Sequence, residues 1–215
     1  MTEDERFKVY INSLDRENPL WLEELETDAR REGIPIIRRE TQSLLRVLLA
    51  MRRPEKILEI GTAIGFSALF MSQYAPPDCH ITTIEKYEKR IPAARENFRK
   101  AGRDDRITLL EGDACRILPE LMESYDFIFM DGAKGQYIHF LPEVLRLLGE
   151  NGILVSDNVL QDGELIQSRF AVTRRNRTIH ERMREYLYEL KHNEALETVI
   201  LTLGDGTAVS VRKQV

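Results

Sequence analysis

The sequence has little cysteine and no long apolar run. Its 215 residues include two cysteines, Cys79 and Cys115, which lie far apart and form no Cys-x-x-Cys pair. Neither a disulfide framework nor a cysteine zinc site is therefore predicted. No apolar stretch approaches the ~18 residues that a membrane helix needs, and the polar, acidic start of the chain does not resemble a signal peptide. We expect a cytoplasmic protein that does not associate with a membrane.

Positive charge is also in short supply. The chain has 31 Lys and Arg against 36 Asp and Glu, a formal net charge of -5. This balance argues against a surface coated with positive charge for bulk nucleic-acid binding, although it allows a local basic patch. With 42% hydrophobic and 31% charged residues, the composition is typical of a globular protein, and the length suits a single domain over residues 1–215.

The hydrophobic pattern changes near residue 53. Before it, apolar residues recur at three- and four-residue spacing, which predicts extra N-terminal helices within 1–52 at 4–14, 19–32 and 38–52. After it, short apolar runs predict strands at 56–60, 80–85, 106–111, 125–130 and 152–156. Between and after them the pattern predicts helices at 64–75, 88–102, 114–122, 137–149 and 178–192. This alternation indicates a Rossmann-like α/β core over 53–215, a parallel sheet with helices on both faces.

The end of the chain departs from this alternation. Two apolar segments, 196–203 and 207–212, flank Gly204-Asp205-Gly206, a tight-turn signal typical of a hairpin. The hairpin would add one antiparallel strand and complete a seven-stranded, mostly parallel sheet. Class I methyltransferases end in this way, whereas dinucleotide dehydrogenases generally do not.

A glycine turn after the first predicted strand indicates a cofactor site. Gly61 and Gly65 are spaced GxxxG, so the middle glycine that lets a backbone cradle a pyrophosphate is missing. This disfavours a nicotinamide oxidoreductase and suits an adenosine cofactor without phosphates, namely S-adenosylmethionine. Glu85 ends the second strand, where an acid accepts hydrogen bonds from ribose hydroxyls. Asp113 follows the third strand and is expected to accept from the adenine amino group.

Acidic and amide side chains follow the fourth and fifth predicted strands. Asp131 comes after one, and Asp157 and Asn158 come after the next. Two carboxylates and an amide oxygen form an all-oxygen ligand set that favours Mg²⁺, although Asp and Asn also cap helices. Lys134, three residues beyond Asp131, is a candidate general base; the alternative is an ordinary surface lysine.

Several motifs together resemble a known family. The segments ILEIGTAIGFSAL, TIEKYEKR, GDA, FIFMDGAKGQY and GILVSDNVL are similar to the metal-dependent O-methyltransferases of the catechol and caffeoyl-CoA type. The resemblance spans residues 34–160. Ile34-Pro35-Ile36-Ile37, DGAKGQY and SDNVL are most similar to the branch that methylates 5-hydroxyuridine at the tRNA wobble position, although Ile37 stands where that branch is expected to have methionine.

The resemblance implies a set of site residues and partners. It implies that the S-adenosylmethionine site is lined by Ile37, Glu59, Gly61, Ser67, Glu85, Asp113, Ala114 and Asp131. It implies Mg²⁺, or another divalent cation that prefers oxygen, at Asp131, Asp157 and Asn158. It also implies a homodimer, and a tRNA anticodon stem-loop as the substrate that becomes 5-methoxyuridine.

The predicted metal site does not distinguish a catechol substrate from a 5-hydroxyuridine substrate, because both present two adjacent oxygens. Basic residues favour RNA: we predict phosphate contacts from Arg38 and Arg39, near the cofactor entrance, and from Arg174, Arg175 and Arg177, which form a separate cluster with Arg169. The alternative for the cluster is a solvated stretch that pairs with nearby glutamates. The rival hypotheses are a catechol-like or caffeoyl-CoA-like small-molecule methyltransferase and a non-catalytic cofactor- or RNA-binding module.

Overall fold

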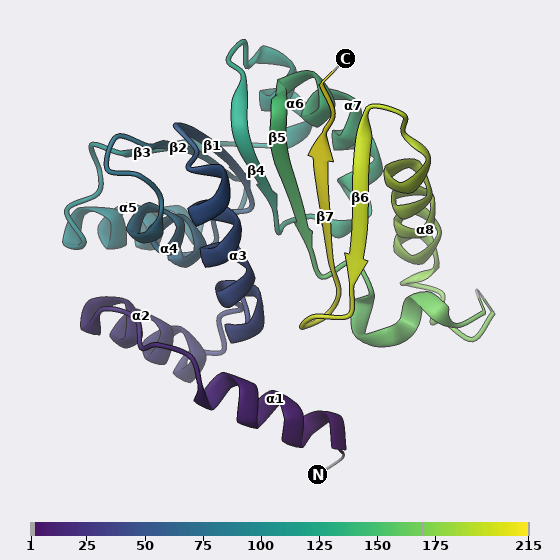
Figure 1. The fold of residues 1–215 in the computed structure, drawn as a ribbon, viewed down its shortest axis with the longest axis horizontal. Helices are drawn as coiled ribbons and strands as arrows, with labels where there is room; N and C mark the ends of the chain where they lie inside the picture. Colours follow the sequence, from purple (N-terminus) through teal and green to yellow (C-terminus); the bar gives the residue numbers. More distant parts are fainter. Residues whose placement is uncertain (1–2, 169, 215) are drawn as a thin grey trace.

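A single seven-stranded sheet organises the chain (Figure 1). The computed structural model describes residues 3–168 and 170–214. The strand order is β3-β2-β1-β4-β5-β7-β6, and β7 pairs antiparallel with both of its neighbours. The strands are β1 (Lys56–Ile60), β2 (His80–Glu85), β3 (Ile107–Glu111), β4 (Tyr125–Met130), β5 (Leu148–Asp157), β6 (Leu196–Leu201) and β7 (Thr207–Arg212). The predicted mostly parallel sheet with its antiparallel terminal hairpin is thus confirmed.

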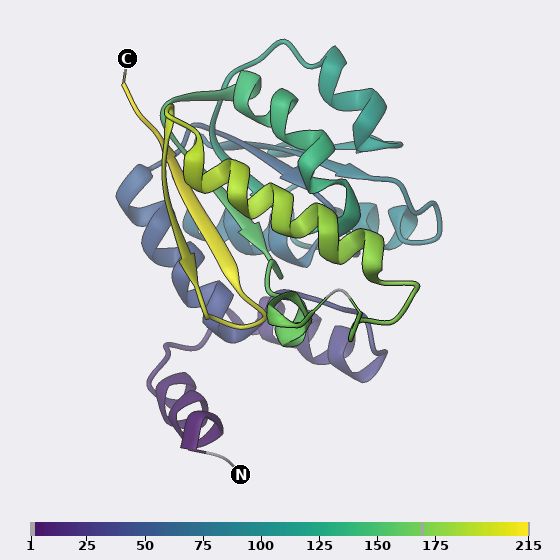
Figure 2. The ribbon, with the colours of Figure 1, turned by 90° about the vertical axis from the view of Figure 1, so that its right-hand side faces the viewer.

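Helices cover both faces of the sheet, each over its own apolar core. One core joins the sheet to α2 (Leu20–Arg31), α3 (Arg39–Arg52), α4 (Phe66–Tyr74) and α5 (Ile91–Lys100). The other joins it to α6 (Ala114–Ile117), α7 (Tyr137–Leu147) and α8 (Arg177–His192), and Figure 2 shows α8 crossing this face. Because the central strands are covered on both sides, runs such as 57–60 are buried throughout.

Three predicted boundaries were wrong by three residues or more. The helix expected at 114–122 ends at Ile117 and continues only as a 3₁₀ turn, η1 (Leu118–Glu120), where Pro119 lacks the N–H of an α-helix. The helix expected from 88 begins at Ile91, with a proline in its first turn. The strand expected from 152 begins at Leu148, since β5 already pairs there with β4 before a register shift. Two further 3₁₀ turns, η2 (Lys134–Gln136) and η3 (Gln161–Ile166), were not predicted.

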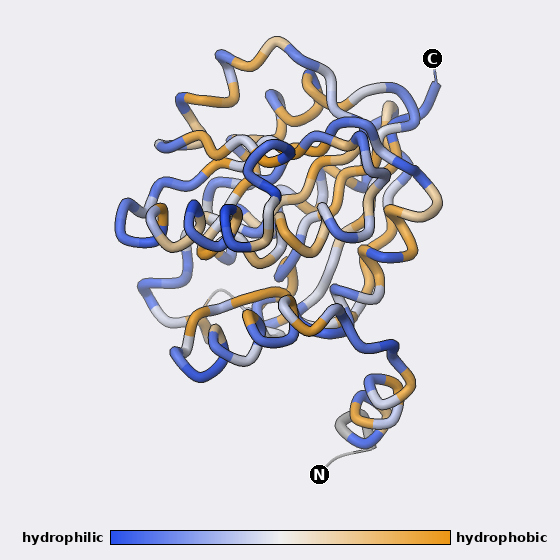
Figure 3. The backbone as a smooth tube through the Cα atoms, turned by 90° about the vertical axis from the view of Figure 1, so that its left-hand side faces the viewer, coloured by the Kyte–Doolittle hydropathy of each residue, from blue (hydrophilic) through white to orange (hydrophobic). Residues whose placement is uncertain are grey.

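The first helix, α1 (Glu3–Ser13), projects away from the sheet and its covering helices (Figures 1 and 3). The segment after it is tied to α3, where the Ser43 hydroxyl donates to the Asp15 carboxylate at 2.8 Å. Within residues 3–168 and 170–214, no helix is long and apolar enough to cross a membrane.

Candidate active site

The strand register brings the predicted site residues to one edge of the sheet. Ile60 of β1 is paired with Ile84 of β2 on one side and with Met130 of β4 on the other. Met130 is in turn paired with Ser156 of β5. The residues that directly follow these four paired residues therefore lie side by side at one edge of the sheet. They are Gly61, Glu85, Asp131 and Asp157. Since β1 lies where the strand order reverses, this edge is the expected ligand crevice of an open α/β sheet.

Glycine is required at the turn after β1. Gly61 has φ +107°, and a Cβ there would lie 2.8 Å from the carbonyl oxygen of Asp131. The absence of a side chain lets the ends of β1 and β4 approach each other, and the Asp131 amide donates to the Ile60 carbonyl at 3.0 Å. Gly65 begins α4 with φ +86°, where a Cβ would overlap the Phe98 ring. The glycine spacing thus reflects two separate close contacts.

A pocket of about 380 Å³ lies over this turn. Its walls include the predicted cofactor residues Ile37, Gly61, Ser67, Glu85 and Asp131. A second hollow of about 160 Å³ continues beyond it and is lined by Glu85, Asp113 and Ala114. Glu85 and Gly61 border both spaces. The two hollows suit an elongated ligand that lies across the strand ends.

The two predicted nucleoside-binding acids are fixed by backbone donors. Glu85 accepts from the Ala63 amide at 2.6 Å and from the Tyr87 amide at 2.7 Å, one on each carboxylate oxygen. Asp113 caps α6 through the Cys115 amide and pairs with Lys86 at 2.6 Å; the hydrogen bond from Lys86 lowers the pKa of Asp113. Each oxygen keeps a second lone pair, so both acids can still accept from a ligand hydroxyl or amine.

Glu59 lies beneath the turn instead of in the lining of either hollow. Its side chain is fully buried and accepts a short hydrogen bond from the Thr83 hydroxyl. Burial raises the pKa of Glu59 to about 7, while the hydroxyls of Ser67 and Thr83 oppose the rise. The contact of Glu59 with the cofactor stays a prediction. In the structure, its hydrogen bond with Thr83 joins β1 to β2.

Asp131 and Asp157 are two neighbouring acids at the ends of β4 and β5. Removal from water raises the pKa of Asp131 to about 8, and the Asp157 carboxylate adds to the rise, while Lys134 opposes it. Asp157 is 1% exposed and its Oδ1 accepts from the Thr207 hydroxyl at 3.0 Å. Two neighbouring carboxylates withdrawn from water are unfavourable as anions unless a positive charge compensates them.

The predicted metal ligands Asp131, Asp157 and Asn158 fit a hard divalent cation, because all three offer oxygen atoms. Asn158 follows Asp157 with φ +58° and so turns away from β5 immediately after the carboxylate. Within the part of the chain that the structure describes, no three His, Cys, Asp or Glu side chains gather into a metal site. The predicted set has two carboxylates and one amide oxygen, an all-oxygen set of the kind that Mg²⁺ prefers.

Lys134 is held beside these residues. Its Nζ donates to Oδ1 of Asn158 at 2.8 Å, and it lies 3.9 Å from Oδ2 of Asp205. Because an amide oxygen has two lone pairs, Asn158 can accept from Lys134 and still face a cation. Lys134 is only half-buried and lines the 380 Å³ pocket, so a ligand can reach its amine.

A further cavity of about 650 Å³ opens on the other side of Lys134. Ala133 and Lys134 line both this cavity and the 380 Å³ pocket. The remaining walls are mostly polar: Gly135, Gln136, Gln161, Glu164, Asn176, Ile179, Arg182 and Asp205. We name this space the acceptor cavity, because it meets the first pocket at the candidate base.

The predicted RNA-contact arginines differ in their surroundings. Arg174 and Arg175 are exposed, directly before Asn176 of the acceptor cavity. Arg177 donates to the Val172 carbonyl at 3.3 Å. Arg39 pairs with Glu23 at 2.5 Å and Glu26 at 3.0 Å, and thereby joins α3 to α2. Arg38 precedes α3 and is exposed, while Arg169 lies outside the described residues.

The terminal hairpin contributes site residues that the sequence interpretation missed. Thr207, the first residue of β7, donates to Asp157, and Asp205 in the turn before β7 lies 3.9 Å from Lys134. Tyr137 at the start of α7 donates its hydroxyl to the carbonyl of Met130 at 2.9 Å, next to Asp131. The signal for the first two was available: a strand paired antiparallel to β5 begins where β5 ends, so the Gly-Asp-Gly turn must lie at the ligand edge.

Comparisons with known proteins agree with this geometry. A sequence model described as O-methyltransferase matches residues 12–213. Tapetum-specific methyltransferase 1 from Arabidopsis thaliana is 29% identical, over 97% of this chain and 94% of the relative. Caffeoyl-CoA O-methyltransferase from Eucalyptus gunnii is 31% identical, over 79% of this chain and 71% of its own. The structure of an SAH-bound methyltransferase from Podospora anserina superposes with a TM-score of 0.88 at 27% identity, over 100% of this chain and 97% of the other.

Proposed function

Because this chain belongs to the O-methyltransferase family, we propose that it transfers a methyl group from S-adenosylmethionine to one of two adjacent oxygens on a small catechol-like acceptor. The family membership and the fold support S-adenosylmethionine as the methyl donor. The names of relatives, such as catechol O-methyltransferase from Niastella koreensis, 32% identical over 57% of this chain, support an acceptor with vicinal oxygens.

The arrangement of the two spaces suits a direct displacement. The donor occupies the hollows at Gly61 and Glu85, and the acceptor enters from the acceptor cavity. The acceptor oxygen forms the new bond to the methyl carbon, the carbon–sulfur bond breaks, and its electron pair stays on sulfur. The hydroxyl proton passes to Lys134 in its neutral amine form, which leaves an ammonium beside Asn158 and Asp205. When bound at the two aspartates and Asn158, a divalent cation would orient both acceptor oxygens and favour ionisation of one.

One observation supports this proposal above the others: Lys134 lines both the 380 Å³ pocket, which is the donor pocket of this proposal, and the acceptor cavity, while Asp131 lines the donor pocket beside it. The test is product formation from purified protein, S-adenosylmethionine, Mg²⁺ and a free catechol, followed by mass spectrometry. A methylated catechol is expected. The absence of both a methylated catechol and a methylated tRNA nucleoside, whichever divalent cation is supplied, would contradict the proposal.

A second candidate substrate is 5-hydroxyuridine in a tRNA anticodon stem-loop, methylated to 5-methoxyuridine. The polar walls of the acceptor cavity support it, since side-chain amides at Gln136, Gln161 and Asn176 both donate and accept hydrogen bonds, as a nucleobase edge requires. The exposed Arg174 and Arg175 lie beside that cavity, where phosphate oxygens would find them.

Competing the two substrates distinguishes the candidates. Equal concentrations of a free catechol and a 5-hydroxyuridine stem-loop are given to the protein, and each product is quantified. Preferred turnover of the RNA, with a KM that rises in an Arg174→Ala/Arg175→Ala variant, would favour the tRNA substrate. Preferred turnover of the catechol, unaffected by that variant, would favour the small molecule. Tests in cells follow the same logic: loss of 5-methoxyuridine from tRNA when the protein is removed supports the RNA.

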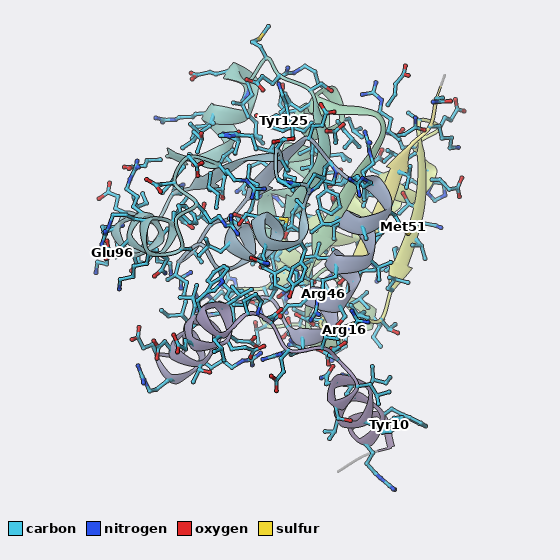
Figure 4. The ribbon with its side chains drawn as sticks, turned by 60° about the vertical axis from the view of Figure 1, so that its left-hand side comes forward. Tyr10, Arg16, Arg46, Met51, Glu96 and Tyr125 are labelled. Carbon is cyan, nitrogen blue, oxygen red and sulfur yellow. The ribbon has the colours of Figure 1, made fainter. Side chains whose placement is uncertain are left out.

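We also propose that two copies of this chain form a homodimer through α1. Phe7, Tyr10, Ile11 and Leu14 form an apolar stripe at helical spacing, and all four are exposed. Figure 4 shows Tyr10 on α1 away from the sheet, and Met51 on the outer side of α3. Val47, Met51, Val199 and Val211 are exposed on α3 and the terminal hairpin. One copy therefore offers both an unpaired apolar helix and an apolar surface for the helix of a second copy.

A further inference from the structure

The turn between β6 and β7 is fixed against the loop that follows β5. The Val159 amide donates to the Gly206 carbonyl at 2.9 Å, and the Leu160 amide donates to the Asp205 carbonyl at 3.0 Å. A Cβ at Gly206 would overlap the Leu160 side chain, so the two segments are in close contact. The backbone of Asp205 thus has a defined position beside the residues predicted to hold the cation.

The Asp205 side chain points into the site. Its side chain is 5% exposed, lines the acceptor cavity, and lies 3.9 Å from the Lys134 ammonium. A carboxylate withdrawn from water is costly unless a cation compensates it. Once it carries the transferred proton, Lys134 is a cation within ion-pair distance of this carboxylate, and it also donates to Asn158 at 2.8 Å. The lysine is therefore held from two sides, by an amide that borders the donor pocket and by a carboxylate that borders the acceptor cavity.

Two partners matter because a lysine side chain is long and rotates freely. A single hydrogen bond to Asn158 leaves the four-carbon stem several orientations, whereas a second attraction, to the Asp205 carboxylate, restricts them. We propose that Asp205 is a positioning residue for methyl transfer: its carboxylate keeps the Lys134 side chain at the junction of the two cavities. This inference rests on the proposed function, in which Lys134 receives the proton of the acceptor hydroxyl.

The first test is the kinetics of Asp205→Asn, which keeps the size of the side chain and removes its charge. We expect kcat to fall by about 10- to 100-fold, the scale of a small displacement of a catalytic group, while the acceptor KM and the S-adenosylmethionine Kd stay within about twofold. Glu197→Gln is the matched control. Glu197 lies on the same hairpin and 3.8 Å from Lys213, but its side chain is 82% exposed and far from the cavities; its kinetics should equal those of the wild type.

The second test asks whether Asp205 acts through Lys134. If it does, Lys134→Met/Asp205→Asn should be no slower than Lys134→Met alone. An additive fall in kcat, an unchanged kcat in Asp205→Asn, or a change confined to the acceptor KM would overturn the inference. Wild-type protein without product would instead contradict the proposed function. Even if the wild-type protein makes no product, a crystal structure of Asp205→Asn tests the inference. We expect Lys134 to leave Asn158 in that structure, and a Lys134 side chain that has not moved would overturn the inference.

Discussion

The hydroxyl of Thr207 donates to Oδ1 of Asp157 at 3.0 Å, and both residues are buried. Thr207 is the first residue of β7, and it is paired in register with Asp157, the last residue of β5. The hydrogen bond fixes one carboxylate oxygen and leaves Oδ2 available. A second polar residue that orients a metal ligand is worth about 10- to 100-fold in metal affinity.

Thr207→Val should therefore weaken Mg²⁺ binding by about tenfold or more, because valine has the same shape without the hydroxyl. The Mg²⁺ concentration at half-maximal rate measures this effect. Thr198→Val is the matched control, since Thr198 is also buried in the terminal hairpin but bonds to Ser210 and the Leu190 carbonyl. An equal shift in both variants would mean that the hairpin, and not the contact with Asp157, is responsible.

Gly61→Ala should abolish S-adenosylmethionine binding. The added methyl would lie 2.8 Å from the Asp131 carbonyl oxygen, so the ends of β1 and β4 would have to separate. Titration calorimetry measures the affinity. Gly102→Ala is the control: its φ is also positive, at +59°, but its Cβ meets nothing within 4 Å, so it should lose only about 1 kcal/mol of stability and bind normally. Normal binding by Gly61→Ala would contradict the assignment of this turn.

Glu85→Ala should weaken S-adenosylmethionine binding by about 10- to 100-fold, because hydrogen bonds to a charged group contribute about 1.5–3 kcal/mol. At saturating donor, kcat should stay near its original value, since the predicted contact of Glu85 is with the ribose and not with the methyl group. Glu111→Ala is the control, on the neighbouring strand and paired with Glu85 in register, but exposed and bonded to Arg95. Equal losses in both variants would argue against a specific ribose contact.

Activity should depend on a divalent cation. Chelation with EDTA should stop methylation and Mg²⁺ should restore it, because Asp131 and Asp157 need a compensating positive charge. Asp157→Ala should reduce product formation by at least about a hundredfold, whereas Glu96→Ala, an exposed acid paired with Arg99, should leave it unchanged. Methylation that persists in Asp131→Ala and Asp157→Ala would exclude catalysis through this pair.

Ile11→Glu should convert the proposed dimer into monomers, because it introduces a charge into the apolar stripe of α1. Light scattering after gel filtration measures the mass. Val9→Glu is the control: Val9 is equally exposed, but at 3.6 residues per turn it faces away from the stripe. A monomeric wild type, or a monomer from both variants, would contradict an interface built on this stripe.

The sequence predicted the fold better than it predicted the supporting contacts of the site. Alternating strands and helices are local patterns, so the class of sheet and the antiparallel last strand followed from periodicity and turn chemistry. The short α6 was missed because an apolar helical pattern continues to residue 122 while Pro119 prevents an α-helix. The apolar spacing favours a longer helix and Pro119 opposes it, and the tertiary packing determines which of the two prevails.

Residues at strand ends were located correctly because parallel strands end at a common edge. Gly61, Glu85, Asp131 and Asp157 meet there as the alternation requires. Asp205 and Thr207 were missed because their contacts span about fifty residues or more and depend on β7 inserting beside β5. The surroundings of Arg39 were missed for a related reason, since its pairing with Glu23 and Glu26 depends on how α2 packs against α3.

The position of β7 also bears on when the protein becomes competent during its synthesis. The last strand to be made enters between β5 and β6, and its first residue completes the hydrogen bonding of Asp157 (Figure 1). Asp157 therefore gains its hydrogen bond from Thr207, and Lys134 its Asp205 partner, only after the final strand has been made and has inserted into the sheet.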